Sequence, residues 1–390
     1  MNTSEVIYLD NHSTTRLDPG VLEAMLPFFS ERYGNAASTS HAFGHDAAEA
    51  VGVARGQVAQ LVGADPREII FTSGATEANN LALKGAVAAA GAASGHLVTT
   101  AVEHPSVLDT ADRLARSGCE LSIVGVDRHG RVDPDDVAAA IRPETILVSV
   151  MWANNEVGTI NPVDRIAAVC RNAGVLFHTD AVQAAGRVPV DVGEIQADLV
   201  SLSAHKLYGP KGIGALVVRR GAPRVRLQPL FDGGGHESHL RSGTLPVPLI
   251  VGFGRAAQLA AESQDDDSRQ LEPLVDQLWQ GLSRRLDELV RHGHPVHRLP
   301  GNLNVGFGGV DGDALLTGLS RIAVSSGSAC TTAVPEPSHV LSAMDVDERL
   351  SRASLRFGLG RFNTADDIEV AIEDVVAVVE RLRAATTTPR

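Results

Sequence analysis

Short apolar runs alternate with alanine-rich stretches through the middle of the chain. Between about residues 68 and 220, the apolar runs have the length and the β-branched composition of strands, and helix-length segments separate most of them. This pattern predicts βαβ units and a mostly parallel sheet, which is an α/β fold. The predicted strands are 69–71, 97–100, 146–151, 176–179, 199–202 and 215–218.

The pattern changes after about residue 251. A long helical stretch at 253–292 is followed by a β-rich and glycine-rich region and then by a helix at 365–385. A chain of 390 residues also exceeds the size at which a single core stops growing. We therefore expect a second, smaller domain, with the acidic run at 265–267 as a solvated turn.

The composition is that of an ordinary globular protein, with 44% hydrophobic and 21% charged residues. Lys and Arg number 34 against 47 Asp and Glu, and the net charge of -13 disfavours binding to nucleic acid or to an anionic membrane surface. The sequence pattern supports neither a signal peptide nor a membrane span. Cys119, Cys170 and Cys330 lack CxxC spacing, which argues against a disulfide framework and against a cysteine metal site within one chain. We expect a cytoplasmic protein.

Polar side chains follow five of the predicted strands. Ligands of a parallel sheet bind outside the carboxyl ends of the strands, so we expect these side chains to line one site. The five positions are 74–76, His104, 154–155, Asp180 with Gln183, and 203–206.

Lys206 is the most informative of these residues. It follows the apolar run 199–202, with Ser203 and His205 beside it. A lysine held among other cations and partly desolvated has a lowered pKa and can supply the neutral amine that condenses with an aldehyde such as pyridoxal phosphate. A surface lysine in a Gly-Pro turn is the alternative interpretation.

The chain offers a partner for each part of such a cofactor. Asp180 ends an apolar strand and could pair with the pyridine nitrogen, although an aspartate that caps a helix would look the same. Gln183, one helical turn further on, could donate to the phenolate oxygen. The segment 74–76 opens a helix and could hold the phosphate, with Ser203 and His205 completing that site; a simple helix start is equally compatible.

Three further residues are candidates for chemistry. His104 precedes a proline at a strand end and could stack on the pyridine ring, or it could be structural. Cys330 lies in a run of small polar residues, where an exposed thiol is a good nucleophile, whereas Cys119 and Cys170 are interpreted as packing residues. Arg356 alternates with apolar neighbours and could bind an anion or form an ion pair between domains.

The motifs taken together, in their order along the chain, resemble those of a cysteine desulfurase from the NifS/IscS-like branch of the class V aminotransferase family. The resemblance runs from about residue 6 to residue 380, and it is also compatible with a homologue dedicated to DNA phosphorothioation. The motifs that carry it are 8–15, 33–35, 73–80, 154–158, Asp180, Lys206, 241–244 and 327–330.

The resemblance implies a pyridoxal-phosphate-dependent transferase fold, of the aspartate aminotransferase-like kind, assembled as a homodimer. It implies a large cofactor-binding domain at 16–255 around a mostly parallel seven-stranded sheet. A small α+β domain would combine 1–15 with 256–390 and carry a mobile cysteine loop at about 325–335.

Site residues follow from the resemblance in the same way. Lys206 would form the Schiff base with the cofactor, Asp180 would pair with the ring nitrogen, and His104 would stack on the ring. The other cofactor contacts would be Ala75, Thr76, Ser203 and His205 around the phosphate, Asn155 and Gln183 on the phenolate side, and Thr244 from the partner subunit. The substrate carboxylate would be held by Asn35, Asn155 and Arg356.

The implied reaction converts L-cysteine to L-alanine. Lys206 would remove the α-proton, and Cys330 would attack the substrate sulfur and carry it as a persulfide to acceptor proteins of iron-sulfur cluster assembly, tRNA thiolation or DNA phosphorothioation. Cys330 could also contribute to a transient iron-sulfur cluster with a partner. The chain departs from the family at Ala36, where proline is usual, and at Gly358, where serine is common, so its affinity for the substrate could differ.

Two other functions remain compatible with these residues. A related pyridoxal-phosphate lyase or aminotransferase, such as a selenocysteine lyase, would share Lys206 and Asp180 but would not need Cys330. A non-catalytic sulfur-relay or scaffold subunit would keep the fold without turnover, but here every cofactor position is filled.

Overall fold

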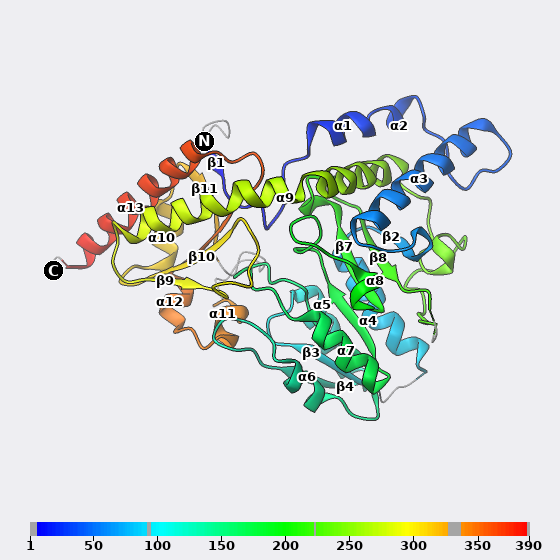
Figure 1. Ribbon diagram of the computed structural model, residues 1–390, viewed down its shortest axis with the longest axis horizontal. Coiled ribbons are helices and arrows are strands. Elements are labelled where there is room, and N and C mark those ends of the chain that lie inside the picture. Colours follow the sequence, from blue (N-terminus) through cyan, green and yellow to red (C-terminus); the bar gives the residue numbers. More distant parts are fainter. Residues whose placement is uncertain (1–5, 92–94, 222–223, 327–336, 388–390) are drawn as a thin grey trace.

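The computed structural model describes residues 6–91, 95–221, 224–326 and 337–387. Its larger part is built on a seven-stranded sheet with the strand order β2-β8-β7-β6-β5-β3-β4 (Figure 1). All neighbouring strands are parallel except β8, which runs antiparallel to β2 and β7. The strands are β2 (Ile69–Thr72), β3 (His96–Thr100), β4 (Glu120–Val124), β5 (Thr145–Ser149), β6 (Leu176–Asp180), β7 (Leu199–Ser203) and β8 (Gly214–Val218).

The predicted α/β class and mostly parallel sheet are confirmed. All six predicted strands are present, within two residues of their predicted ends. The seventh, β4, was missing from the prediction because it is an edge strand whose residues are mostly half-buried or exposed, so its sequence lacks the continuous apolar run of a central strand.

Helices cover both faces of this sheet, and alternate strand residues pack into two different cores. On β2, Ile69 and Phe71 join one core, whereas Ile70 joins the other together with Leu81 of α4. None of the described helices is long and apolar enough to cross a lipid bilayer. The helices of this part are α1 (Pro19–Met25), α2 (Pro27–Ser30), α3 (Ala42–Leu61), η2 (Pro66–Glu68), α4 (Ala75–Ala89), α5 (Pro105–Arg116), α6 (Pro134–Ala140), α7 (Val163–Ala173), α8 (Val192–Ile195), η3 (Ala204–Lys206) and η4 (Glu237–His239).

The smaller part combines the start of the chain with its C-terminal third. Strand β1 (Ile7–Tyr8) pairs in parallel with β11 (Ile322–Ala323), next to an antiparallel sheet of order β12-β13-β10-β9. The strands of that sheet are β9 (Leu289–His292), β10 (Asn302–Phe307), β12 (Ser325–Ser326) and β13 (Ser354–Gly358). The helices are α10 (Gly312–Gly318), α11 (His339–Ala343), α12 (Glu348–Arg352) and α13 (Ala365–Thr387).

Helix α9 (Val247–Ser283) runs through both parts of the molecule (Figure 1). Phe253 in its first half belongs to the core beside the large sheet, whereas Leu278 in its second half belongs to the core under α13. The predicted domain boundary at residue 255 therefore falls inside one continuous helix, and the division into domains stays a prediction.

The prediction of a solvated turn at 265–267 is wrong. These three aspartates lie within α9, which continues through the charged stretch. Asp267 there accepts a 2.7 Å hydrogen bond from Arg361, so at least one of these carboxylates has a structural role.

The packing of α3 against α9 depends on a glycine. A Cβ atom placed on Gly254 of α9 would lie 2.5 Å from Cα of Ala54 on α3, which is closer than the two helix backbones allow. A Cβ atom placed on Gly52 of α3 would meet no atom within 4 Å.

These two glycines give a matched prediction for stability. Gly52→Ala should raise the free energy of unfolding by about 0.5–1 kcal/mol, because alanine reduces the backbone entropy lost in a helix. Gly254→Ala has the same local benefit, but the clash should lower the free energy of unfolding by about 1–3 kcal/mol. Thermal melting followed by circular dichroism compares the two variants, and equal melting temperatures would contradict the close approach of α3 and α9.

Candidate active site

A cleft of ≈ 510 Å³ lies at the carboxyl ends of the central strands. Most of the residues that the sequence predicts for the site line this cleft. They are Ala75, Thr76, His104, Asn155, Asp180, Gln183, Ser203, His205, Lys206 and Arg356.

Lys206 ends η3, the short turn that follows β7. Its Nζ donates hydrogen bonds of 2.6 Å to the backbone carbonyls of His12 and Ser13. The next residues of that N-terminal segment are also bound to the turn, since the Thr15 amide donates to the His205 carbonyl at 3.0 Å. The amine is thereby held at the cleft by a segment almost 200 residues away in the chain.

Asp180 is buried at the end of β6, with both carboxylate oxygens in hydrogen bonds. Its Oδ1 accepts from the Val182 amide at 3.0 Å, and its Oδ2 accepts from Nδ2 of Asn79 at 2.8 Å. Asp180 can therefore both cap the following turn and pair with a pyridine nitrogen, because it also lines the cleft.

His104 precedes α5 and is connected to Asp180 through two side chains. Asn79 donates to Ser106 Oγ at 2.8 Å as well as to Asp180, and Ser106 Oγ lies 2.8 Å from Nδ1 of His104. The Ser106 amide donates to that same Nδ1, so the ring proton of a neutral His104 is on Nε2. Burial is the main cause that lowers the pKa of His104, which favours the neutral ring.

The start of α4 fits a phosphate group. Gly74 precedes the helix with a φ of 150° and provides no side-chain cap, so the first amides of α4 keep their capacity to donate. Ser203 Oγ is buried without a hydrogen-bond partner among the described residues. His205 has its pKa lowered to about 4 by burial and by the nearby charges of Lys206 and Lys211. An anion at this end of the cleft would satisfy these groups.

Arg356 on β13 connects the two parts of the molecule. Its guanidinium donates to Asp10 Oδ1 at 2.7 Å, to Ser13 Oγ at 2.6 Å and to the Asn155 carbonyl at 3.0 Å. Its Nε is buried without a partner among the described residues, although the side chain lines the cleft. The two sequence interpretations, an ion pair between domains and a group that awaits an anion, are therefore both compatible with its position.

Two predicted residues, Asn35 and Thr244, do not line this cleft, and a third cannot be placed. Asn35 is exposed after α2, with its Oδ1 accepting from the Ala37 amide at 2.9 Å, and Thr244 is exposed shortly before α9. Cys330 lies outside the described residues, as does most of the predicted loop at 325–335. Cys119 and Cys170 are buried free thiols, which confirms their interpretation as packing residues.

Several residues that line the cleft have no role predicted from the sequence. They include Ser13, Thr14 and Glu77, which lie in the motifs 8–15 and 73–80, together with Met151 and Lys211. The available signal was the polar run 10–15 directly after an apolar pair, but no local pattern shows which cleft such a run will enter.

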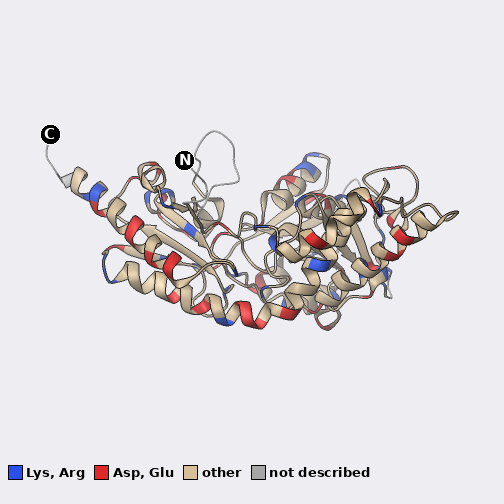
Figure 2. Cartoon of the chain, turned by 90° about the horizontal axis from the view of Figure 1, so that it is seen from above, with Lys and Arg blue, Asp and Glu red and all other residues tan. Residues whose placement is uncertain are grey.

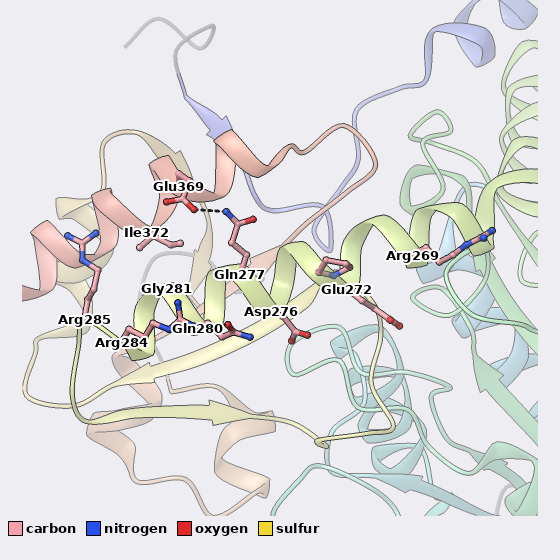
Figure 3. Close-up of a pocket in the computed structure, with 11 residues that line it drawn as sticks. Arg269, Glu272, Asp276, Gln277, Gln280, Gly281, Arg284, Arg285, Glu369 and Ile372 are labelled. Atoms are coloured by element: carbon pink, nitrogen blue, oxygen red, sulfur yellow. Dashed lines mark hydrogen bonds between the residues drawn. The ribbon is translucent and has the colours of Figure 1, made fainter.

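A second hollow, of ≈ 810 Å³, lies along the outer side of α9 where it faces α13 (Figure 3). Gln277 there donates to Glu369 at 2.5 Å, and most of the other lining side chains are charged or amide groups. Its lining includes no lysine, histidine or cysteine. The cleft at the strand ends is therefore the better candidate for the active site.

The sequence model of the family described as "Aminotransferase class-V" matches residues 7–370. The chain is 54% identical over 377 residues to "Cysteine desulfurase IscS" of Anaeromyxobacter dehalogenans (strain 2CP-C), covering 97% of this chain and 93% of that protein. Among solved structures, a "NIFS-LIKE PROTEIN" is 36% identical with a TM-score of 0.90, covering 97% of this chain and 100% of that one. Another, "SspA in complex with cysteine", is 35% identical with a TM-score of 0.81, covering 92% and 100%.

The chain belongs to the class V aminotransferase family, whose members use pyridoxal phosphate. The predicted family, fold class and cofactor are thereby confirmed. The orphaned Ser203 hydroxyl, the uncapped start of α4 and the carboxylate of Asp180 fit the phosphate and ring nitrogen of that cofactor.

Glu103 precedes His104 in the chain and is fully buried. Its Oε1 accepts hydrogen bonds of 2.8 Å from Thr100 Oγ1 and from the Met151 amide. Burial raises its pKa to about 8, so the carboxyl is protonated in the folded protein at neutral pH.

This shift predicts how stability depends on pH. A pKa of about 8 in the folded state, against 4.5 for an ordinary glutamate, means that the folded state binds more protons between these values. The contribution of Glu103 is therefore complete below about pH 4.5 and decreases as the pH rises to about 8. Glu103→Gln should make the melting temperature less dependent on pH in this range. Glu144→Gln, at an exposed site, is the control, and an unchanged pH profile for Glu103→Gln would contradict the shift.

Proposed function

We propose that the cleft around Lys206 performs the cysteine desulfurase reaction, with L-cysteine as substrate and L-alanine as product. The observation that carries this proposal is the presence in one cleft of Lys206, Asp180 and Arg356. They provide an amine for an aldehyde, a carboxylate for a ring nitrogen and a guanidinium for a substrate carboxylate. The same activity is named for the relative that is 54% identical over 97% of this chain.

Pyridoxal phosphate, when bound, withdraws electrons from the α-carbon of an amino acid. In this chain Lys206 would bind its aldehyde, Asp180 would hold the proton on the ring nitrogen, and His104 would cover one face of the ring. The remaining contacts would be Ala75, Thr76, Ser203 and His205 at the phosphate, Asn155 and Gln183 at the phenolate oxygen, and Thr244 from a second copy of the chain.

The substrate contacts follow from the charges of the cleft. Arg356 would bind the carboxylate of L-cysteine, with Asn155 beside it and Asn35 contributed across a dimer. Lys206, once its amine is released by the substrate, would accept the α-proton and return it. Neutral His104 carries its proton on Nε2 and would act as a second proton donor.

Cys330 would receive the sulfur. Its thiolate attacks the substrate sulfur, an S–S bond forms, and the C–S bond breaks with its electron pair remaining on carbon. The carbon takes up the proton that the Cys330 thiol has lost, so that L-cysteine and a thiol give L-alanine and a persulfide. This balance requires no external oxidant.

Replacing Cys330 tests this step. Cys330→Ala should abolish sulfide and alanine formation from L-cysteine with a reductant, while the yellow absorbance of the bound cofactor remains. Cys119→Ala removes a buried thiol and should keep most of the activity, which makes it the matched control.

Full activity of Cys330→Ala would instead favour a lyase, such as a selenocysteine lyase, or an aminotransferase. Absence of turnover in the wild type, with the cofactor bound, would favour a sulfur-relay or scaffold subunit.

We further infer a homodimer. Apolar side chains are exposed on α1 and α2, between α2 and α3, and at the start of α3. These elements lie at the upper right of Figure 1. They are Leu22, Leu26, Phe29, Tyr33 and Phe43. Exposed apolar side chains gathered in this way are typical of a subunit interface. Asn35 lies in the same region, which agrees with a role in the partner's site.

A charge in this patch should separate the subunits. Phe29 is 59% exposed, and Phe29→Asp would place a carboxylate in the interface. The variant should sediment as a monomer in analytical ultracentrifugation and lose activity. Val296→Asp, at a side chain that is 75% exposed in the smaller part, should stay dimeric. A dimeric Phe29→Asp would place the interface elsewhere.

The sulfur acceptors would be proteins of iron-sulfur cluster assembly, tRNA thiolation or DNA phosphorothioation. The relative's name, IscS, supports the first. Acidic and basic residues alternate along the ribbon in Figure 2, and the net charge is -13, which favours protein acceptors over direct contact with nucleic acid. The free thiols of Cys119 and Cys170 support a reducing compartment such as the cytoplasm.

A further inference from the structure

Glu77 lines the cleft beside the predicted phosphate contacts, but it has no role in the function described so far. It lies in the first turn of α4, directly after Thr76. Only 9% of its side chain is exposed. Because a carboxylate removed from water is costly unless it is paired, the partners of Glu77 show what it does.

Glu77 holds the turn in front of α4. Its Oε2 accepts a hydrogen bond of 2.8 Å from the Ser73 amide, across Gly74. A glutamate at the third position of a helix that accepts an amide ahead of the helix is one half of a capping box. Gly74 has no side chain for the other half, so the contact from Glu77 fixes this turn from the helix side.

The charge of Glu77 conflicts with a phosphate at the same helix start. Burial would raise the pKa of this carboxyl, but the hydrogen bonds from Arg241 and Ser73 outweigh burial and lower it, so the group is ionised at neutral pH. A carboxylate and a phosphate at one helix N-terminus share its positive end and repel each other. Glu77 can hold the turn without harm to the phosphate site only if its charge is offset.

Arg241 offsets that charge. Its Nε donates to Oε1 of Glu77 at 2.9 Å, and its NH2 donates to Oε2 at 3.5 Å. The Arg241 side chain is 21% exposed, so both members of the pair are largely removed from water, where opposite charges attract more strongly than on the surface. A planar guanidinium can bind both oxygens of a carboxylate, which a lysine cannot match.

The segment that carries Arg241 is itself held in place. Glu237 accepts from the Phe71 amide at 2.7 Å and pairs with Arg55 at 2.5 Å. The residues 237–239 have φ values of 49°, 56° and 64°. Residues other than glycine rarely adopt this left-handed conformation, and it persists only where surrounding contacts impose it. The contacts of Glu237 therefore fix the strained turn from which the chain reaches Arg241.

We propose that Arg241 is a positioning residue for the cofactor phosphate: it neutralises Glu77, so that this carboxylate fixes the turn before α4 without repelling the phosphate. The inference rests on the proposed function, in which the start of α4 binds the phosphate of pyridoxal phosphate. Arg241 acts through Glu77 and needs no contact with the cofactor.

Two forms of the cofactor test the proposal. The apoenzyme is titrated with pyridoxal phosphate and with pyridoxal, which has the ring and the aldehyde but no phosphate, and binding is followed by absorbance. Arg241→Met should weaken the binding of pyridoxal phosphate about 10- to 100-fold, because an unpaired carboxylate repels the phosphate. The same variant should leave the binding of pyridoxal unchanged.

A second substitution should reverse this loss. Glu77→Gln removes the charge but keeps an oxygen for the Ser73 amide, so the double variant with Arg241→Met should recover most of the affinity for pyridoxal phosphate. Arg241→Lys keeps the positive charge and should also retain most of it. Arg116→Met removes the arginine of an exposed ion pair with Asp112, at the end of α5 far from His104, and should change the affinity for neither compound.

Unchanged binding of pyridoxal phosphate in Arg241→Met, or equal weakening of both compounds, would overturn the proposal. A double variant as weak as Arg241→Met would overturn it too, because the charge of Glu77 would then not be the cause. Failure of the proposed function looks different. With the phosphate bound elsewhere, Thr76→Val would keep the wild-type preference for pyridoxal phosphate over pyridoxal, and without desulfurase activity the wild type would not convert L-cysteine.

Discussion

The attachment of the segment 10–15 to both parts of the molecule is the constraint on which the active site depends. On one side, Lys206 donates to the carbonyls of His12 and Ser13, and on the other, the Asn11 amide donates to the Gly358 carbonyl at 2.9 Å. These contacts fix the end of β7 relative to β13. They also bring the amine of Lys206 and the guanidinium of Arg356 to one cleft, although the large sheet and the small sheet supply them separately.

The charges of this cleft follow from that attachment. Lys206, Arg187 and Arg356 lie close together, and burial together with these cations keeps His12 and His205 neutral. A site with buried cations and neutral donors suits a ligand with a phosphate and a carboxylate, because the ligand then supplies the missing negative charge. The anionic cofactor and substrate of a cysteine desulfurase have these groups, so the electrostatics of the cleft and the family assignment support each other.

Much of the fold could be predicted from local patterns. Buried strands such as β7 are continuous apolar runs, and Lys206 follows one directly, so both the strand and the position of this lysine at its end could be predicted. Two features could not. The edge strand β4 lacks the continuous apolar run of a central strand, and the acidic run at 265–267 resembles a solvated turn although the surrounding helix continues through it. In both cases the neighbouring structure, and not the local composition, determines the conformation.

The sequence by itself determined the class of fold, which strands are followed by polar residues, and the family. These depend on periodicity and on short motifs. Only the tertiary structure decided which distant groups meet. The pairing of Arg356 with Asp10 joins residues 346 positions apart, and the contact of Gln183 with the His12 carbonyl joins residues 171 positions apart. It also left Asn35 and Thr244 outside the cleft of their own chain. Such contacts depend on how the sheets and α9 pack, which no local pattern encodes.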